Sequence, residues 1–216
     1  MEHPILNRIR NESFTPLDWF APSDMGETKF IILIGNAGPA MFRRFWRDGG
    51  GRAASSETTQ MDDWTRWVVD PLAQDLGAQA VYPFDKPYLP FQQWARAAGG
   101  VHQSPLGLNI HNIYGLWHAY RSALLFPVAF DLPRQSAGSH PCESCADKPC
   151  LSACPVSAFN GREYDIDACA AHLHSENSCM EGGCLARLAC PVGVAYQYKK
   201  PQIQFHMNAF KVAHEL

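Results

Sequence analysis

The sequence predicts an α+β fold in two parts. An N-terminal α/β sandwich-like domain is expected over residues 1–135 and a second, C-terminal domain over residues 136–216. Two observations support this division. Short apolar runs alternate with helical patterns in the first part, and all eight cysteines lie between Cys142 and Cys190. With 216 residues, 46% of them hydrophobic, the chain can bury a core in one or two domains.

The first elements follow from the apolar pattern. Residues 1–28 predict a short helix and a loop, and the run KFIILIG at 29–35 predicts a buried strand that ends at a glycine. The strand is followed by GNAGPA at 35–40, which is interpreted as a strand-to-helix turn rather than a phosphate-binding loop. Apolar residues of 41–46 share one helical face. The glycine- and serine-rich segment 47–57 is expected to be a surface loop.

The rest of the first part continues the alternation. Residues 62–76 have helical spacing, with Pro71 expected to kink the helix. The run AQAVYPF at 78–84 predicts a second strand, residues 91–98 a helix, and RSALLFPVAF at 121–130 a further strand. The tail at 201–216 is expected to be helical.

Charge and hydropathy exclude several classes of partner. The 18 basic and 21 acidic residues give a formal charge of -3, which offers no electrostatic case for nucleic acid or an anionic membrane. The sequence has no run of 18 apolar residues, the length a membrane span requires. The start, MEHPILNRIRNESF, lacks the layout of a secretory signal. We therefore expect a cytoplasmic protein.

The cysteines form two groups of related spacing. The groups are Cys142-x2-Cys145-x4-Cys150-x3-Cys154 and Cys169-x9-Cys179-x4-Cys184-x5-Cys190. Each group ends in Cys-Pro, and the stretches CLSACPVS and CLARLACPVG suggest an internal duplication. This is a loosened form of the pattern of bacterial two-cluster ferredoxins. In that pattern three cysteines of a group hold one cluster and the Cys-Pro cysteine holds the other.

The ligand assignment follows from what a short loop can reach. A tight loop can supply three thiolate ligands to a cubane iron–sulfur cluster, but it does not easily reach the fourth ligand position. A short helix starting at Cys150 or Cys184 carries the last cysteine of its group to the neighbouring cube, and the following proline stops the backbone. We therefore predict a ferredoxin-like domain with two [4Fe–4S] clusters. Cluster one is held by Cys142, Cys145, Cys150 and Cys190, and cluster two by Cys154, Cys169, Cys179 and Cys184.

Zinc and disulfides are the alternatives for the cysteines. A structural zinc site uses two short C-x2-4-C knuckles, which Cys142/Cys145 and, less well, Cys179/Cys184 resemble. Disulfides at this density are typical of small secreted domains. A histidine in the cysteine region, such as His172, would be a ligand only if it replaced a cysteine as in Rieske centres, and eight cysteines already suffice.

The C-terminal pattern resembles the iron–sulfur domain of epoxyqueuosine reductase, a cobalamin-dependent tRNA-modification enzyme, and more distantly that of reductive dehalogenases. The similarity covers about residues 104–195. In that reductase a second cysteine group also follows the first Cys-Pro, and the ligands divide as assigned above. The resemblance implies an α/β cobalamin-binding domain joined to a ferredoxin-like domain. The Gly-Lys-Asn signature of the family is replaced here by GLWHAYRSA, and the tRNA-recognition part is expected to be absent.

A polar and aromatic stretch before the cysteines supplies candidate cofactor-binding residues. They are His111, Tyr114, Trp117, His118 and Arg121. Side chains of this kind line pockets that grip flat cofactors, and the two histidines titrate near neutrality, as proton donors in a reduction must. The alternative is an amphipathic segment that packs in the core. The sequence identifies no catalytic residue.

Three functions are compatible with these patterns. The first is electron transfer through two clusters to a redox partner protein or a bound cofactor. The second is an oxidoreductase in which the clusters feed electrons to cobalamin or flavin, which then acts on a small-molecule substrate. The third is an interaction module stabilised by zinc. Iron and sulfide in the purified protein distinguish the first two from the third.

Overall fold

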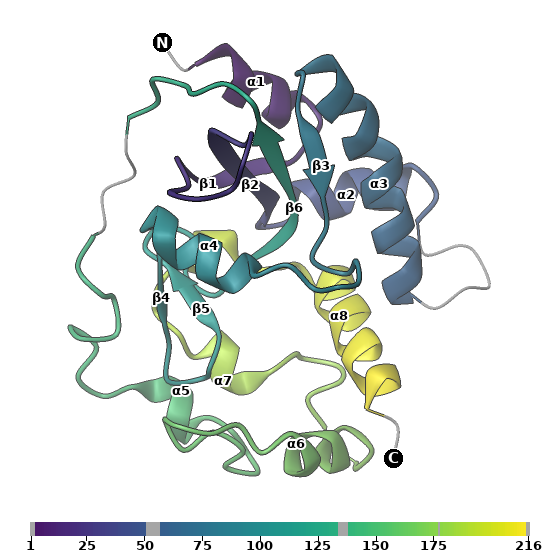
Figure 1. Ribbon diagram of the computed structural model, residues 1–216. Coiled ribbons are helices and arrows are strands. Elements are labelled where there is room, and N and C mark those ends of the chain that lie inside the picture. The colour runs from purple at the N-terminus through teal and green to yellow at the C-terminus, as the bar shows by residue number, and fades with distance from the viewer. Residues whose placement is uncertain (1–2, 51–56, 134–137, 177, 215–216) are drawn as a thin grey trace. The chain divides into compact units, whose positions relative to one another are not determined.

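Two compact units make up the computed structural model of the chain, which describes residues 3–50, 57–133, 138–176 and 178–214 (Figure 1). The first unit comprises Met1–Val101 and His118–Gly138, and the second comprises His102–Trp117 and Ser139–Leu216. The sequence analysis placed residues 102–117 in the first domain, over residues 1–135, whereas the structure assigns them to the second unit. None of the helices in the described ranges is long and apolar enough to cross a membrane.

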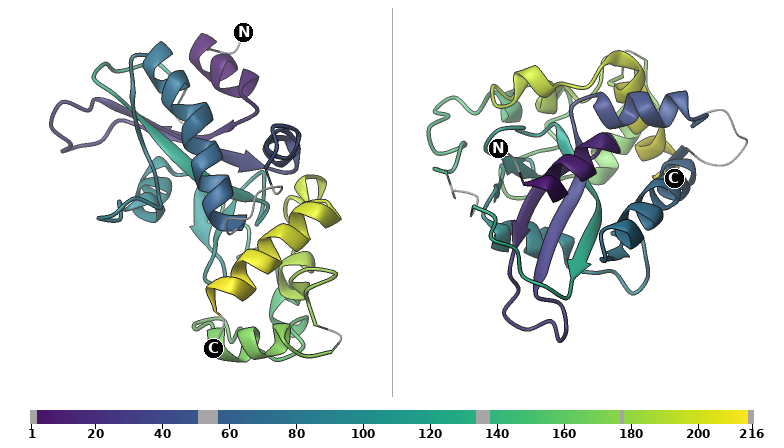
Figure 2. Two further views of the ribbon diagram at one scale, coloured as in Figure 1. Left: turned by 90° about the vertical axis from the view of Figure 1, so that its right-hand side faces the viewer. Right: turned by 90° about the horizontal axis from the view of Figure 1, so that it is seen from above.

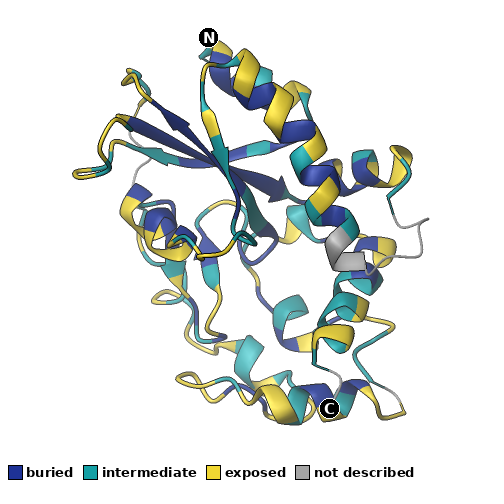
Figure 3. Cartoon of the chain, turned by 45° about the vertical axis from the view of Figure 1, so that its right-hand side comes forward, coloured by how far each residue is buried: buried dark blue, intermediate teal, exposed yellow. Residues whose placement is uncertain are grey.

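The first unit is built on a four-stranded antiparallel sheet with strand order β1-β2-β6-β3. Its strands are β1 (Thr15–Phe20), β2 (Phe30–Ala37), β3 (Gln79–Val81) and β6 (His118–Phe126). The apolar run of β2 is almost wholly buried, as Figure 3 shows for the centre of the sheet. A strand of continuous apolar residues is stable in the middle of a sheet only when both faces are covered.

Helices cover the two faces of this sheet. They are α1 (Pro4–Asn11), α2 (Ala40–Arg47), α3 (Glu57–Asp75) and α4 (Phe91–Ala98). Phe91 and Trp94 of α4 pack against Ile31 and Leu33 of β2. Because side chains alternate along a strand, Ile32 points to the opposite face, where α1 lies (Figure 2).

The prediction of a mixed α+β fold with a cysteine-rich C-terminal part is confirmed, and the following elements differ from the expectation. Residues 15–20 form strand β1, although a loop was expected there. The loop was expected because proline is rare in strands, but Pro16 lies in a strand at the edge of the sheet, where proline is tolerated. Helix α3 begins at Glu57 and includes Pro71, which is exposed, so water can bond the carbonyl that proline leaves free. Strand β6 begins at His118, three residues before the expected start.

The second unit consists of short helices and loops around a small apolar core. Its elements are β4 (Val101–Gln103) with β5 (Asn109–His111), α5 (Pro149–Ser152), α6 (Ile166–Leu173), α7 (Leu185–Leu188), the 3-10 helix η1 (Val194–Tyr196) and α8 (Lys200–Ala213). Leu106, Ile110 and Leu116 pack there with Ala186 and Cys190. These contacts explain why 102–117 belongs to this unit. Helix α8 confirms the helical tail as far as the described residues extend.

A buried carboxyl group in the first unit makes a hydrogen bond across the sheet. Asp18 of β1 is fully buried, and its Oδ2 accepts a hydrogen bond from the Tyr120 hydroxyl of β6 at 2.5 Å. Burial raises the pKa of Asp18 to about 6, although hydrogen bonds from Tyr120 and the Gly100 backbone act against this rise. The native fold therefore favours the neutral form of this group.

We expect Asp18 to make the protein less stable as the pH rises. The native state retains the Asp18 proton up to about pH 6, whereas the unfolded chain releases it near pH 4. Stability due to this group is therefore lost between about pH 4 and pH 6, by about 3 kcal/mol in all. Unfolding midpoints measured from pH 4.5 to 7.5 should fall less for Asp18→Asn than for the natural protein. Equal slopes in the two proteins would contradict the assignment.

Candidate metal centre

Short helices position the eight cysteines of the second unit. Cys150 lies in α5, and Cys184 is the residue that immediately precedes α7. The expectation of short helices at these two cysteines is confirmed. Helices α5 and α7 pack against each other (Figure 1). The two Cys-Pro cysteines, Cys154 and Cys190, each follow the end of one of these helices by two residues.

Three of the thiols, those of Cys142, Cys150 and Cys190, have pKa values raised by burial and by neighbouring thiolates. Burial, followed by the negative charge of the Cys190, Cys150 and Cys145 thiolates, raises the pKa of Cys142 to about 11. Burial and then the thiolates of Cys190 and Cys145 raise the pKa of Cys150. Burial and then the Cys145 thiolate raise the pKa of Cys190. Cys190 therefore lies within electrostatic reach of three cysteines from the other sequence group.

The remaining four thiols form a second set. Burial raises the pKa of Cys169, a hydrogen bond from the Tyr164 hydroxyl lowers it, and the thiolates of Cys154 and Cys179 raise it again. Burial and the thiolates of Cys179 and Cys169 raise the pKa of Cys184. Cys154, the Cys-Pro residue of the first sequence group, thus lies near cysteines of the second.

Backbone N–H groups stabilise the negative charge of several of these thiolates. The N–H of Ala158 donates to the Sγ atom of Cys154 at 3.3 Å. Burial raises the pKa values of Cys150, Cys184 and Cys190, and hydrogen bonds from the backbone N–H groups of Leu151, Arg187 and Val192, respectively, act against this rise. Donors of this kind suit thiolates that serve as cluster ligands, since hydrogen bonds to sulfur tune cluster potentials.

The structure can be compared with the two alternatives for the cysteines, which were disulfides and a zinc site. All eight are free thiols, and none is joined in a disulfide. Six of them, Cys142, Cys150, Cys154, Cys169, Cys184 and Cys190, belong to or pack against the apolar core of the second unit. Among the described side chains, no three His, Cys, Asp or Glu residues are grouped so as to hold a single metal ion.

Arg187 fixes the helix that lies between Cys184 and Cys190. Its guanidinium donates two hydrogen bonds to the carbonyl oxygen of Leu116, one of them at 3.0 Å from Nε. The same group lies over the ring of Trp117 at 4.6 Å and over the ring of Tyr198 at 4.7 Å. A guanidinium is suited to this position because it stacks on aromatic rings while it donates in its own plane.

Two glycines allow the loop that follows Cys190 and the 102–117 segment to lie backbone against backbone. A Cβ atom on Gly115 would lie 2.0 Å from the carbonyl oxygen of Val192, and one on Gly193 would lie 2.3 Å from that of Tyr114. Both glycines also have a positive φ, 57° and 73°. Only residues without a side chain fit here. The loop that follows Cys190 therefore rests directly on the backbone of the 102–117 segment.

The five candidate cofactor-binding residues are divided between the units. In the second unit His111 is buried beneath Tyr114, with ring centroids 4.5 Å apart, and Trp117 is buried against Arg187. In the first unit His118 is buried on β6, and Arg121 donates to Asp62 and Thr65 of α3. They do not form one cluster within either unit. Their predicted role in cofactor binding stays a prediction.

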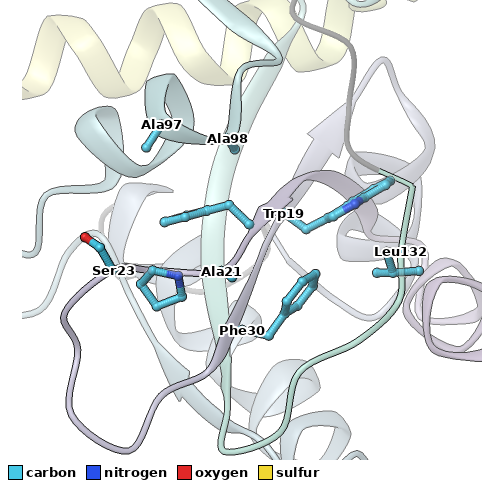
Figure 4. A pocket seen from close by; sticks show the side chains of 9 residues that line it. Trp19, Ala21, Ser23, Phe30, Ala97, Ala98 and Leu132 are labelled. Atoms are coloured by element: carbon cyan, nitrogen blue, oxygen red, sulfur yellow. The ribbon is translucent and has the colours of Figure 1, made fainter.

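A pocket in the first unit is lined by none of these five residues. It has a volume of about 480 Å³ and is lined by the described residues Trp19, Phe20, Ala21, Pro22, Ser23, Phe30, Ala97, Ala98 and Leu132 (Figure 4). Trp19 closes one side by donating from Nε1 to the carbonyl oxygen of Pro133 at 3.1 Å.

Sequence reasoning missed several residues that shape the cysteine region. Tyr164 stacks on Phe159 at 4.6 Å and bonds Cys169, and nothing in the local sequence marks it as a thiolate partner. The sequence does mark Arg187, because it is the one cation between Cys184 and Cys190. The sequence marks Gly193 less clearly, by its position two residues after Cys190-Pro191.

The fold of the chain is similar to that of solved structures, although its sequence matches no family model and no curated protein. A crystal structure of selenomethionine-labelled epoxyqueuosine reductase matches with a TM-score of 0.51 and 15% identity, over 92% of this chain and 68% of that one. The C. elegans B12-trafficking protein CblC, a human MMACHC homologue, matches with a TM-score of 0.52 and 15% identity, over 96% of this chain and 94% of that one.

The resemblance to epoxyqueuosine reductase expected from the cysteine pattern is thus confirmed for the fold, and it extends well beyond residues 104–195. The match to CblC covers nearly all of both chains. The chain therefore shares its fold with epoxyqueuosine reductase and with CblC.

Proposed function

We propose that this chain is a redox protein whose second unit is a ferredoxin-like domain that holds two [4Fe–4S] clusters. One observation carries the proposal: the eight cysteines divide into two sets of four near neighbours, and each set draws its fourth member from the other sequence group. A cubane has four ligand positions, so two complete sets suit two cubes.

The chain's own residues supply what a cluster site requires. The thiolates of Cys142, Cys145, Cys150 and Cys190 would hold cluster one, and those of Cys154, Cys169, Cys179 and Cys184 would hold cluster two. Apolar side chains such as Leu106 and Phe159 shield the sulfur atoms from water. Backbone N–H donors, including that of Ala158, stabilise negative charge on them. Each bound cluster would supply one-electron transfer.

A second candidate is a reductase in which the clusters supply electrons to cobalamin. The observation that favours it is the shared fold with a B12-trafficking protein over 96% of this chain and with epoxyqueuosine reductase over 92%. We assign no residue of this chain to the corrin. Three of the candidates, His111, Trp117 and His118, are buried side chains within their own units. Flavin is the alternative organic cofactor.

Anaerobic purification tests the proposal. The protein should be brown and contain about eight iron and eight sulfide per chain, and reduction with dithionite should produce the EPR signals of interacting [4Fe–4S] clusters. A colourless protein with stoichiometric zinc would support the zinc-stabilised interaction module and overturn the redox function. A visible spectrum that shifts when hydroxocobalamin is added, but not when flavin is added, would favour the cobalamin-linked reductase.

A further inference from the structure

A polar pocket in the second unit opens beside Cys142. Its volume is about 580 Å³, which is within the range of small-molecule sites. The side chains that matter for the argument are those of Gln103, Ser104, His140, Glu143, Lys148 and Arg162, and Cys142 itself is part of the lining. Under the proposed function, this pocket reaches a ligand of cluster one.

Two cations without acidic partners give the pocket its charge. Lys148 and Arg162 are both exposed, and neither side chain is in an ion pair found among the residues that the structure describes. Lys148 and Cys142 line the same pocket. Glu143 is the single carboxylate of the lining. Among the Lys, Arg, Asp and Glu side chains of the lining, the two cations therefore outnumber the carboxylate.

The uncharged groups of the pocket add hydrogen-bond donors. The Nδ1 atom of His140 accepts the backbone N–H of Cys142 at 3.2 Å, so in the neutral ring the proton is on Nε2, which becomes a donor. His140 is held in place by stacking on His102, with ring centroids 4.6 Å apart. The Ser104 Oγ accepts the N–H of Leu106 at 3.3 Å, which leaves its own proton to donate.

We propose that this pocket binds the carboxylate or phosphate group of a small anionic molecule that exchanges electrons with cluster one. Two cations and several donors beside one carboxylate favour an oxyanion over a neutral or cationic ligand. Cys142, Cys145, Cys150 and Cys190 would hold the cluster, which would supply one-electron chemistry. The anionic molecule would be a one-electron donor or acceptor that loses or gains one electron as the cluster gains or loses one, with no bond formed or broken. The inference rests on the proposed function, because it requires a cluster at Cys142.

The test uses holoprotein and small redox probes of opposite charge. Reduced protein is mixed with hexacyanoferrate(III), an anion, or hexaammineruthenium(III), a cation, and reoxidation of the clusters is followed by stopped flow. The variant Lys148→Asn/Arg162→Gln removes the two pocket cations, and asparagine tolerates the left-handed backbone at residue 148, where φ is 39°. Lys199→Gln/Lys200→Gln is the matched control, since both lysines are exposed and outside this pocket and the change in net charge is the same.

The pocket variant should react about tenfold more slowly with the anionic probe, and the control less than about twofold more slowly. The cationic probe should not be slowed in either variant, and the difference between variants should shrink with added salt. In addition, inorganic phosphate should slow the anionic probe in the natural protein and have little effect in the pocket variant. Equal slowing by the two double variants would overturn the proposal, and so would the absence of any effect of phosphate.

Failure of the proposed function remains distinguishable from failure of this inference. Iron, sulfide and EPR measurements on each preparation establish first whether the clusters are present. Phosphate binding to the protein, followed by the broadening of its ³¹P resonance, does not require a cluster. If clusters are present and the pocket variant binds phosphate as well as the control, the pocket assignment is wrong and the redox function stands.

Discussion

Replacing Cys190 with alanine is expected to remove the same cluster that Cys142→Ala removes. The two residues belong to different sequence groups, but the thiolate of Cys190 raises the pKa of both Cys142 and Cys150. If these thiols surround one cube, loss of any of them leaves that cube with three ligands. The iron content should then fall by about half, and the EPR spectrum of the surviving cluster should be the same in the two variants.

The complementary pair completes the test of the crossed arrangement. Cys154→Ala and Cys184→Ala should both remove the other cluster and leave a second EPR spectrum, different from the first. Ser144→Ala changes an exposed residue of the same region and should retain both clusters. If Cys190→Ala instead matched Cys184→Ala, each sequence group would hold its own cube, and the crossed arrangement would be wrong.

The cysteine pattern predicts the crossed arrangement from constraints that are local. Short helices lie at Cys150 and Cys184, and a Cys-Pro sequence follows the end of each, as that prediction requires. The same reasoning identified strand β2 from its continuous apolar run and helix α4 from the helical spacing of its apolar residues. Where the chemistry of a segment depends on its immediate neighbours in sequence, the pattern is enough.

Long-range pairing was not predictable in the same way. The buried Asp18 is polar in a strand that also contains Pro16, and its partner Tyr120 is remote in the sequence. Segment 102–117 joins the second unit because Leu106, Ile110 and Leu116 pack there. Apolar residues of that kind would serve equally well in the first unit, so their pattern does not reveal which core they join.

Gly193→Ala is expected to destabilise the second unit and to cause loss of cluster one ahead of cluster two. The new methyl group would lie 2.3 Å from the carbonyl oxygen of Tyr114, so the loop after Cys190 must move away from the 102–117 backbone. Gly115→Ala should act in the same way, because its methyl group would lie 2.0 Å from the carbonyl oxygen of Val192. Steric overlap and backbone strain together should cost about 2–4 kcal/mol. Iron content and the EPR signal assigned to cluster one measure the effect.

Gly107→Ala separates the two causes of this loss. Gly107 lies in the same segment and has a φ of 75°, close to the 73° of Gly193, but nothing lies within 4 Å of the position its Cβ would take. Alanine there introduces backbone strain of about 1 kcal/mol without any overlap. If contact between the two backbones holds Cys190 in place, Gly107→Ala keeps both clusters while Gly193→Ala and Gly115→Ala lose cluster one. If all three variants lose iron alike, strain alone is responsible, and the close approach of the backbones does not position the cysteine.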